Sequence, residues 1–320
     1  MSELRWDSLR GEWIVTATHR MNRPQMPDDW CPFCPGSGRV PDSYGVYLYR
    51  NDFPSFSTPA PPVSVGRDDA WRARQSSGAC DVVLYHPDHN RDFVDIEIDH
   101  LDKLAALWRD RYLDLFEDKH IRYVLIFENN GEEIGVTIPH PHGQIYAFPL
   151  VPPVPAAEMR RARSYKRRTG RCLHCHLLNE EARDGRRIVF DDGEWLAFVP
   201  FAARWPYEVH LYPKRCVDHI GELSPQELRP MVAAIKRLLL TYRNYYERRF
   251  PYMMLFHQAP ATGRAGEGTH LHIEFCPMRR SRDRLKYRAG CETGAGLFIN
   301  DSYPEEKAAE LRALLAEPQM

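Results

Sequence analysis

The chain has 320 residues, of which 43% are hydrophobic and 12% aromatic, enough to bury a sizeable core in one large domain or two medium ones. Lys and Arg number 43 against 44 Asp and Glu, so no global field would draw the chain to nucleic acid or to an anionic membrane. The N-terminal MSELRWDSLRGEW has no apolar signal segment, and no stretch approaches the roughly 18 apolar residues of a membrane span. These features predict a cytoplasmic protein without nucleic-acid or membrane partners.

Seven stretches alternate or run apolar in the manner of strands. In chain order they are residues 81–85, 122–128, 144–149, 195–200, 208–212, 252–257 and 270–276. Residues 100–118 and 226–250 carry apolar residues at helical spacing, and residues 304–316 open with Pro-Glu-Glu, a helix start. The prolines of LVPPVPAAEMRRARSYKRRTGR predict a break near Pro152, and its basic part predicts a helix at a surface or subunit contact.

The same order of parts occurs twice along the chain. Each half has a C-x-x-C pair, strands, a proline-containing turn, a long helix, a strand and an H-x-H strand. The turns are LYHPDHN and LYPKRCVDH, and the H-x-H elements are HPHGQ and HLHIE. The sequence therefore predicts an internal repeat with related halves at residues 1–151 and 152–320.

Four of the eight cysteines fall in two C-x-x-C pairs, which favours metal ligation over a disulfide framework in a chain of this size. Cys31 and Cys34 come from one tight turn typical of a zinc site, and His89 and His140 are the candidates to complete a tetrahedron. A redox dithiol is the alternative, but such a motif needs a strand-to-helix context, whereas Pro-Gly-Ser-Gly follows this pair. With four protein ligands the zinc would be structural, and it would fix the strand that carries His142.

A second zinc site is a candidate in the other half. The corresponding places there are occupied by Cys172, Cys175, Cys216 and His270. His174, His176 and His219 are alternative ligands because they lie close in sequence. The remaining alternative is that these are free thiols beside ordinary surface histidines.

The HPHGQ stretch carries chemistry of its own. On a strand, His140, His142 and Gln144 face the same way. A histidine with a pKa of about 6.5 is substantially neutral at pH 7, and one ring nitrogen can attack phosphorus if the other donates a hydrogen bond. Gly143 allows close approach to a phosphate, and the Gln144 amide can donate to a phosphoryl oxygen without ionising. The pattern predicts an attacking histidine; the alternative is that both histidines bind metal.

These motifs resemble the galactose-1-phosphate uridylyltransferase family, a branch of the histidine-triad superfamily, over nearly the whole chain. The matching segments are HRMNRP, CPFC, RNDFP, HPDHN, FENNGEEIGVTIPHPHGQ, WPYEVHLYPKR, FHQAP, HLHIEFCP and LKYRAGCETGAG. The resemblance implies an α+β, histidine-triad-like fold in which two related halves have antiparallel sheets and outer helices. It also implies a homodimer.

The same resemblance implies a ping-pong reaction in which UMP passes from UDP-glucose to galactose 1-phosphate through uridylyl-His142. Gln144 would contact the transferring phosphoryl group. The family's other substrate contacts fall on Asn129 and Thr137 at the phosphate, Asn51 and Asp52 at the uridine, Arg20 and Arg23 near the phosphates, and Lys286 and Glu292 near the sugar. In the resembled family, a neighbouring subunit contributes some of the last four of these positions. Thr137 stands where the family commonly has serine, and it keeps the hydroxyl.

Some members of the resembled family hold iron through one glutamate and three histidines in the C-terminal half. Glu181, His257 and His272 fall on three of those positions, while Glu274 falls where such members have histidine. The cysteines of this half form a competing ligand set. The sequence therefore favours a second structural zinc over iron.

Two other function classes fit parts of the pattern. Another nucleotidyltransferase or phosphorylase of the superfamily would use a different base or acceptor, although RNDFP and LKYRAGCETGAG favour a sugar nucleotide. A non-catalytic nucleotide-binding module would not need the His142 nucleophile, and hydrolysis is disfavoured by Gln144. The preferred hexose is left open, because epimers differ by one hydroxyl.

Overall fold

The computed structural model describes residues 2–23, 30–63, 65–246, 250–261 and 268–315. The strands in this part of the chain are β1 (Ser2–Asp7), β2 (Glu12–Ala17), β3 (Tyr47–Arg50), β4 (Ala73–Gln75), β5 (Ala79–Leu84), β6 (Tyr123–Asn130), β7 (His142–Phe148), β8 (Ile188–Asp191), β9 (Trp195–Phe198), β10 (Val209–Pro213), β11 (Tyr252–His257) and β12 (His272–Pro277). The helices are α1 (Ile98–Phe116), α2 (Pro153–Thr169), α3 (Leu173–Asp184), α4 (Pro225–Tyr246), α5 (Gly290–Gly294) and α6 (Pro304–Ala313).

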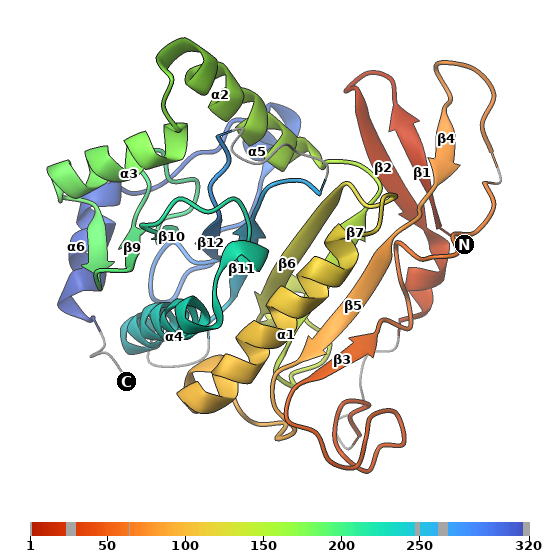
Figure 1. The fold of residues 1–320 in the computed structure, drawn as a ribbon, viewed down its shortest axis with the longest axis horizontal. Helices are drawn as coiled ribbons and strands as arrows, with labels where there is room; N and C mark the ends of the chain where they lie inside the picture. Colours follow the sequence, from red (N-terminus) through yellow and green to blue (C-terminus); the bar gives the residue numbers. More distant parts are fainter. Residues whose placement is uncertain (1, 24–29, 64, 247–249, 262–267, 316–320) are drawn as a thin grey trace.

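One large sheet joins the two halves of the chain (Figure 1). Its strand order is β3-β5-β7-β6-β11-β12-β10-β9-β8, and neighbouring strands are antiparallel. From the central β6–β11 pair the order runs outward through β7, β5 and β3 on one side and through β12, β10 and β9 on the other. The predicted α+β class with antiparallel sheets and outer helices is confirmed.

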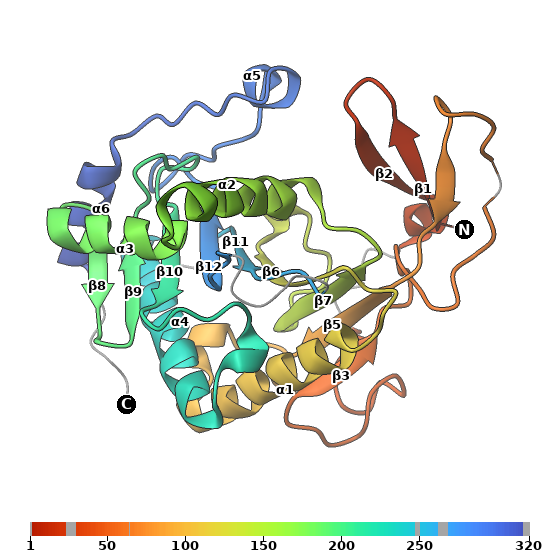
Figure 2. The ribbon, with the colours of Figure 1, turned by 45° about the horizontal axis from the view of Figure 1, so that its top comes forward.

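Helices cover both faces of this sheet. Figure 2 shows α1 and α4 on one face and α2 over the other. The buried side chains of α1, which include Leu101, Leu104 and Trp108, recur every three or four residues and pack in one core with Ile145 and Ala147 of β7. Because side chains alternate along a strand, His142, Gln144 and Tyr146 face away from α1.

All seven predicted strands and three predicted helices are present, with ends shifted by a few residues. The predicted helix over 226–250 ends at Tyr246, and residues 247–249 lie outside the described part; residue 316 of the last helix also lies outside it. The basic run after Pro152 forms α2, as expected.

The three-stranded sheet β2-β1-β4 was not predicted, and it stands apart from the large sheet in Figure 2. Trp6 and Trp13 face each other across the β1–β2 pair with ring centroids 5.3 Å apart, and Arg72 lies 4.1 Å from the Trp6 ring. Such cross-strand aromatic and cation–π contacts add to the stability of a small sheet. Leu4, Trp13 and Val15 of this sheet also pack in one cluster with Phe56 and Cys80.

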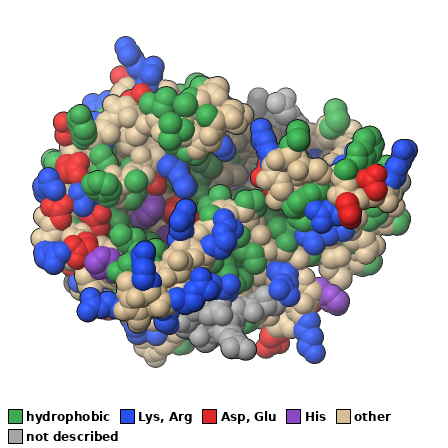
Figure 3. All heavy atoms as spheres, turned by 90° about the horizontal axis from the view of Figure 1, so that it is seen from above, with side chains coloured by type: hydrophobic (Ala, Val, Ile, Leu, Met, Phe, Trp, Pro, Cys, Tyr) green, Lys and Arg blue, Asp and Glu red, His purple; other side chains and the backbone are tan. Residues whose placement is uncertain are grey.

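The face seen from above carries Lys and Arg side chains across its middle, with acidic side chains toward both margins (Figure 3). Among the described residues, no helix is both long enough and apolar enough to cross a membrane.

Candidate active site

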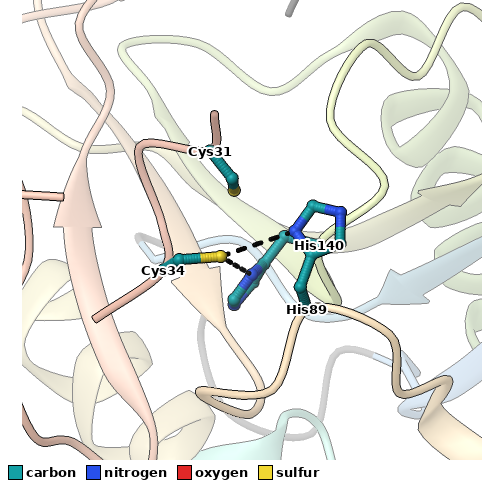
Figure 4. A group of neighbouring side chains, drawn as sticks. All are labelled: Cys31, Cys34, His89 and His140. Carbon is teal, nitrogen blue, oxygen red and sulfur yellow. Dashed lines mark hydrogen bonds between the residues drawn. The ribbon is translucent and has the colours of Figure 1, made fainter. Parts of the chain in front are cut away.

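The first cysteine pair meets two histidines from distant parts of the chain (Figure 4). One ligand atom from each of Cys31, Cys34, His89 and His140 lies within 4.8 Å of the others. The Cys34 Sγ is 3.5 Å from His89 Nδ1 and 3.7 Å from His140 Nδ1. Two thiols and two imidazoles are a donor set that suits tetrahedral zinc. The geometry thus brings together the four residues that the sequence predicted as ligands.

The other ring nitrogen of His140 has its own partners. His140 Nε2 donates to the carbonyl of His86 at 2.8 Å and lies 3.0 Å from the Tyr44 hydroxyl. These contacts leave Nδ1 directed at the thiols, as a metal ligand requires. Tyr44 was not predicted, because a lone tyrosine 96 positions before His140 carries no spacing signal.

His142 has the hydrogen bond that an attacking imidazole needs. Its Nδ1 donates to the carbonyl of His140 at 2.8 Å, which leaves Nε2 with its lone pair. Burial lowers the pKa of His142, and the nearby positive charge of Arg23 lowers it further, so the ring is neutral at pH 7. The Phe33 ring packs beside it, with centroids 5.7 Å apart.

A hollow of about 900 Å³ borders His142, the predicted nucleophile. Asn129 at the end of β6, Thr137 in the following loop and His142 all line it. Gln144 lies on the same face of β7 as His142 but is not among the lining residues. The structure therefore places the predicted nucleophile and two of the predicted phosphate-contacting residues around one space large enough for a nucleotide.

The predicted uridine and phosphate residues of the first half lie in the segments beside β3 and β7. Arg20 donates to the carbonyl of Phe53 at 3.0 Å and lies 3.5 Å from the Tyr146 hydroxyl. The side chain of Asn51 accepts the backbone N–H of Phe53 at 2.8 Å, which shapes the turn after β3. Asp52 accepts hydrogen bonds from Tyr49 and Arg39 at 2.8 and 2.7 Å.

Lys286 and Glu292 are not brought to His142. They lie on the segment around α5, which projects from the body in Figure 2, and neither lines the hollow. Glu292 instead lies 3.8 Å from the Lys286 ammonium group, which also donates to the carbonyl of Ile299.

The second cysteine cluster also assembles. Ligand atoms of Cys172, Cys175, Cys216 and His270 lie within 4.8 Å of one another. His270 Nδ1 is 3.7 Å from Cys175 Sγ, while its Nε2 donates to the carbonyl of Pro213 at 3.0 Å. The alternative ligands His174, His176 and His219 lie outside this group; for instance, His174 Nδ1 is 3.1 Å from the Tyr212 hydroxyl.

A third group joins Glu158, His257, His272 and Glu274, again with ligand atoms within 4.8 Å. His257 Nδ1 is 2.9 Å from a Glu158 oxygen, and its Nε2 is 3.5 Å from Glu274. Two carboxylates and two imidazoles suit a divalent ion such as iron or zinc. By donor chemistry the residues fit a metal, although the third histidine of the iron-binding members is replaced by Glu274.

The family resemblance matched Glu181 to the carboxylate beside His257 and His272, and the structure does not place it there. Glu181 lies on α3 and accepts a hydrogen bond from Arg187 Nε at 2.9 Å, a buried ion pair that satisfies its charge locally. Glu158 of α2 supplies the carboxylate instead. It lies 99 residues before its partner His257, so no spacing motif could select it.

The chain matches known families over almost its full length. Residues 1–152 match the family model for the galactose-1-phosphate uridyl transferase N-terminal domain, and residues 158–318 match the model for the C-terminal domain. A galactose-1-phosphate uridylyltransferase of Thermotoga maritima is 38% identical over 314 residues, covering 98% of each chain.

Two solved structures have a similar fold. One uridylyltransferase structure has a TM-score of 0.89 at 34% identity and covers 98% of both chains. An ADP-glucose phosphorylase from Arabidopsis thaliana with bound ADP-glucose has a TM-score of 0.75 at 24% identity, again over 98% of both. The second likeness concerns the fold alone.

Proposed function

The chain belongs to the galactose-1-phosphate uridyl transferase family, and from this premise we propose that it is an enzyme that transfers UMP from UDP-glucose to galactose 1-phosphate. The products are UDP-galactose and glucose 1-phosphate. The observation that carries the mechanism is the 2.8 Å hydrogen bond from His142 Nδ1 to the His140 carbonyl. This bond leaves the His142 ring neutral, with the lone pair on Nε2, at the wall of the hollow.

In the first step, His142 Nε2 attacks the α-phosphorus of UDP-glucose. A nitrogen–phosphorus bond forms, the bond to the bridging oxygen breaks, and glucose 1-phosphate leaves with that oxygen. The Nδ1 proton stays on the ring and its hydrogen bond to the His140 carbonyl strengthens as the ring becomes cationic. No proton has to move, so the step needs no separate general base.

In the second step, a phosphate oxygen of galactose 1-phosphate attacks the same phosphorus and the nitrogen–phosphorus bond breaks. This returns His142 to its neutral form. Asn129, Thr137 and Gln144 supply donors that do not ionise, and they steady the non-bridging oxygens through both steps. Such donors stabilise the transferring group without activating water.

The remaining substrate contacts are proposals of the same kind. Arg20 and Arg23 neutralise the phosphates beside β7, and Asn51 with Asp52 holds the uridine. Lys286 and Glu292 lie on the projecting α5 segment and would meet the sugar of a neighbouring subunit in a homodimer, which explains their distance from this chain's hollow. Residues 1–151 and 152–320 are the two halves, and the enzyme works in the cytoplasm.

We also propose that both cysteine clusters hold structural zinc. Each has four protein ligands, which leaves no open position for water. In the first cluster, zinc on His140 Nδ1 would fix the residue whose carbonyl orients His142. The group of Glu158, His257, His272 and Glu274 would hold a divalent ion, which would tie α2 to the sheet.

Isotope exchange tests the ping-pong reaction directly. Labelled glucose 1-phosphate should exchange into UDP-glucose without galactose 1-phosphate present, because the first half-reaction is reversible on its own. His142→Gly should abolish this exchange. Absence of exchange in the wild type, with turnover intact, would contradict the covalent route. Exchange with ADP-glucose but not UDP-glucose would instead favour an adenylyl-transferring relative.

A further inference from the structure

We propose that Glu128 is a positioning residue for His142, and that it acts from the rear of the sheet through the hydroxyl of Tyr85. The inference rests on the proposed uridylyl transfer. Glu128 lies on β6 and is 4% exposed, although it belongs to no ion pair among the described residues. A buried carboxyl is costly, so a role beyond packing is needed to account for it.

The Tyr85 hydroxyl occupies the space that a side chain at position 143 would fill. A Cβ built on Gly143 would lie 2.1 Å from the Tyr85 oxygen, which no real contact allows. Gly143 is the residue between His142 and Gln144, and its missing side chain points to the rear face, the one that α1 covers. Tyr85 and Glu128 are also among the residues that line the hollow. Tyr85 therefore supports the nucleophile strand at the point between its two reactive residues.

Tyr85 is itself held firmly. Its backbone N–H donates to the carbonyl of Pro141 at 3.0 Å, and its ring packs edge-on against Trp108 and Phe93 with centroids 5.7 and 5.9 Å away. The side chain is 1% exposed. A displacement of the ring would therefore be passed to the strand rather than absorbed by solvent.

Glu128 lies between two tyrosines. Tyr252 of β11 donates to its Oε1 at 2.6 Å. The other oxygen and the Tyr85 hydroxyl have no further partner of normal geometry among the described residues, yet each group shifts the pKa of the other, so they face one another. Glu128 thus links β11, β6 and the Tyr85 support behind β7.

The second half shows that packing alone does not require this arrangement. There, Phe256 lies opposite Ile273 in the β11–β12 register. Continuing the β6–β7 register by one residue from the Phe127–Gln144 pair brings Glu128 opposite Gly143. An apolar pair in one half therefore corresponds to Glu128 and Gly143 in the half that carries the nucleophile.

Three variants test the proposal. Tyr85→Phe removes one oxygen, Glu128→Ala removes the carboxyl, and Glu128→Gln keeps an acceptor for Tyr252 and a polar partner for Tyr85. The control is Asp81→Asn, which removes another buried carboxyl from the same rear face, where it pairs with Arg111 at 2.8 Å and does not contact Gly143.

The readouts are the single-turnover rate of enzyme uridylylation and the KM for UDP-glucose. We expect Glu128→Ala to slow the single turnover at least about tenfold and Tyr85→Phe about threefold, because a shift well under 1 Å at the nucleophile already slows attack. The KM should change less than about twofold, and the double variant should be no slower than Glu128→Ala alone, since both act through one contact. Glu128→Gln should restore most of the rate.

Unchanged single-turnover rates in both Tyr85→Phe and Glu128→Ala would overturn the proposal. It would also fail if Asp81→Asn slowed the single turnover equally, or if the variants raised the KM for UDP-glucose without slowing the single turnover. If Glu128→Ala does not fold, Tyr85→Phe decides alone. A wild-type protein that forms no uridylyl adduct would refute the proposed function itself, whereas a wild-type adduct with unaffected variants refutes only the role of Glu128.

Discussion

The two halves of the molecule build the same backbone motif and equip it differently. In the first half, His142 Nδ1 donates to the carbonyl of His140 at 2.8 Å, and in the second, His272 Nδ1 donates to the carbonyl of His270 at 3.0 Å. His140 and His270 each face a cysteine sulfur through Nδ1 and donate to a backbone carbonyl through Nε2. The two H-x-H strands therefore share one tautomer pattern.

The residues around the second histidine of each strand differ in charge. In the second half, His272 of β12 is paired with His257 of β11. In the first half, the β6–β7 pairing ends at Phe127 and Gln144, and continuing it by two residues places Asn129 opposite His142. Two residues after the histidine stand Glu274 in one half and Gln144 in the other. Amides suit the donation of hydrogen bonds to an anion, whereas acids and imidazoles suit a cation.

The two histidines, His142 and His272, also differ in what packs against their rings. His272 is 4% exposed, stacks on the Tyr212 ring at 4.6 Å, and belongs to a group closed by Glu158 from α2. His142 instead borders a hollow of about 900 Å³. The two halves therefore share their strand geometry and differ in the charge around the second histidine and in how deeply it is buried, and these differences favour the first half as the proposed nucleotide site.

The largest expected effect separates the two histidines. We expect His142→Ala to lower turnover at least about a thousandfold, because the nucleophile is lost. His272→Ala should still form uridylylated enzyme, since its ring lies outside the hollow. Steady-state turnover of both variants, with folding checked by circular dichroism, measures the difference. Equal losses in two folded variants would remove the distinction between the halves.

On the rear face, Glu128 of the first half corresponds to the apolar Phe256 of the second, so only the first half should have a stability that depends on the charge of this position. Burial raises the pKa of Glu128 to about 7 from 4.5. Between pH 4.5 and 7 the unfolded chain has released this proton while the folded chain keeps it, so stability falls as pH rises through that window, by about 3 kcal/mol in total.

Denaturant unfolding at several pH values measures this stability term. Glu128→Gln should lack it, so the difference between wild type and variant should change with pH, whereas Phe256→Leu should change stability by the same amount at every pH. If the free energies of unfolding of wild type and Glu128→Gln differ by the same amount at every pH, the pKa of Glu128 is not raised.

Exchanging the amide for an acid would make the first half resemble the second. We expect Gln144→Glu to slow uridylylation about a hundredfold, because a donor is lost and a negative charge faces the phosphoryl oxygens. Stopped-flow or quenched-flow single turnover measures this rate. Gln144→Met removes the donor without adding charge and serves as the matched control. A rate in Gln144→Glu equal to wild type would mean that Gln144 does not face the transferring group.

The two cysteine clusters should differ in their effect on catalysis. We expect Cys34→Ser to lower the uridylylation rate about tenfold, since the proposed zinc on His140 would orient the neighbouring histidine. Cys175→Ser should leave the rate within about twofold of wild type, because its cluster supports the strand without the nucleophile. Metal analysis of each purified variant should show the loss of one zinc. A larger catalytic loss in Cys175→Ser would reverse the assignment.

Much of this arrangement could be predicted from the sequence. The C-x-x-C pairs and the H-x-H strands are local signals, and the repeated order of parts predicted which cysteines and histidines would meet. Strand alternation also predicted that His142 and Gln144 share a face, as they do on β7, whereas His140 lies before the strand begins. The long helices followed from their apolar spacing, and α1 and α4 are found close to the predicted ranges.

The contacts between elements could not be predicted in the same way. Glu158 and Glu181 are both acidic residues of the same half, and only the packing of α2 over the sheet distinguishes them. The meeting of Tyr85 with Gly143 joins residues 58 positions apart across a buried face, where the sequence shows only an aromatic and a glycine. The β1–β2 pair was missed because its apolar side chains, among them Leu4 and Val15, pack against Phe56 and Cys80, a contact between distant segments that no local pattern shows.

The most direct test of the account is to locate the covalent intermediate. The purified protein is mixed with UDP-glucose without an acceptor, digested under mildly alkaline conditions that preserve a nitrogen–phosphorus bond, and mapped by mass spectrometry. The account predicts one UMP per chain on the peptide that contains His142, none on the peptide that contains His272, and loss of the adduct when galactose 1-phosphate is added. An adduct on any other residue, or turnover without an adduct, would contradict it.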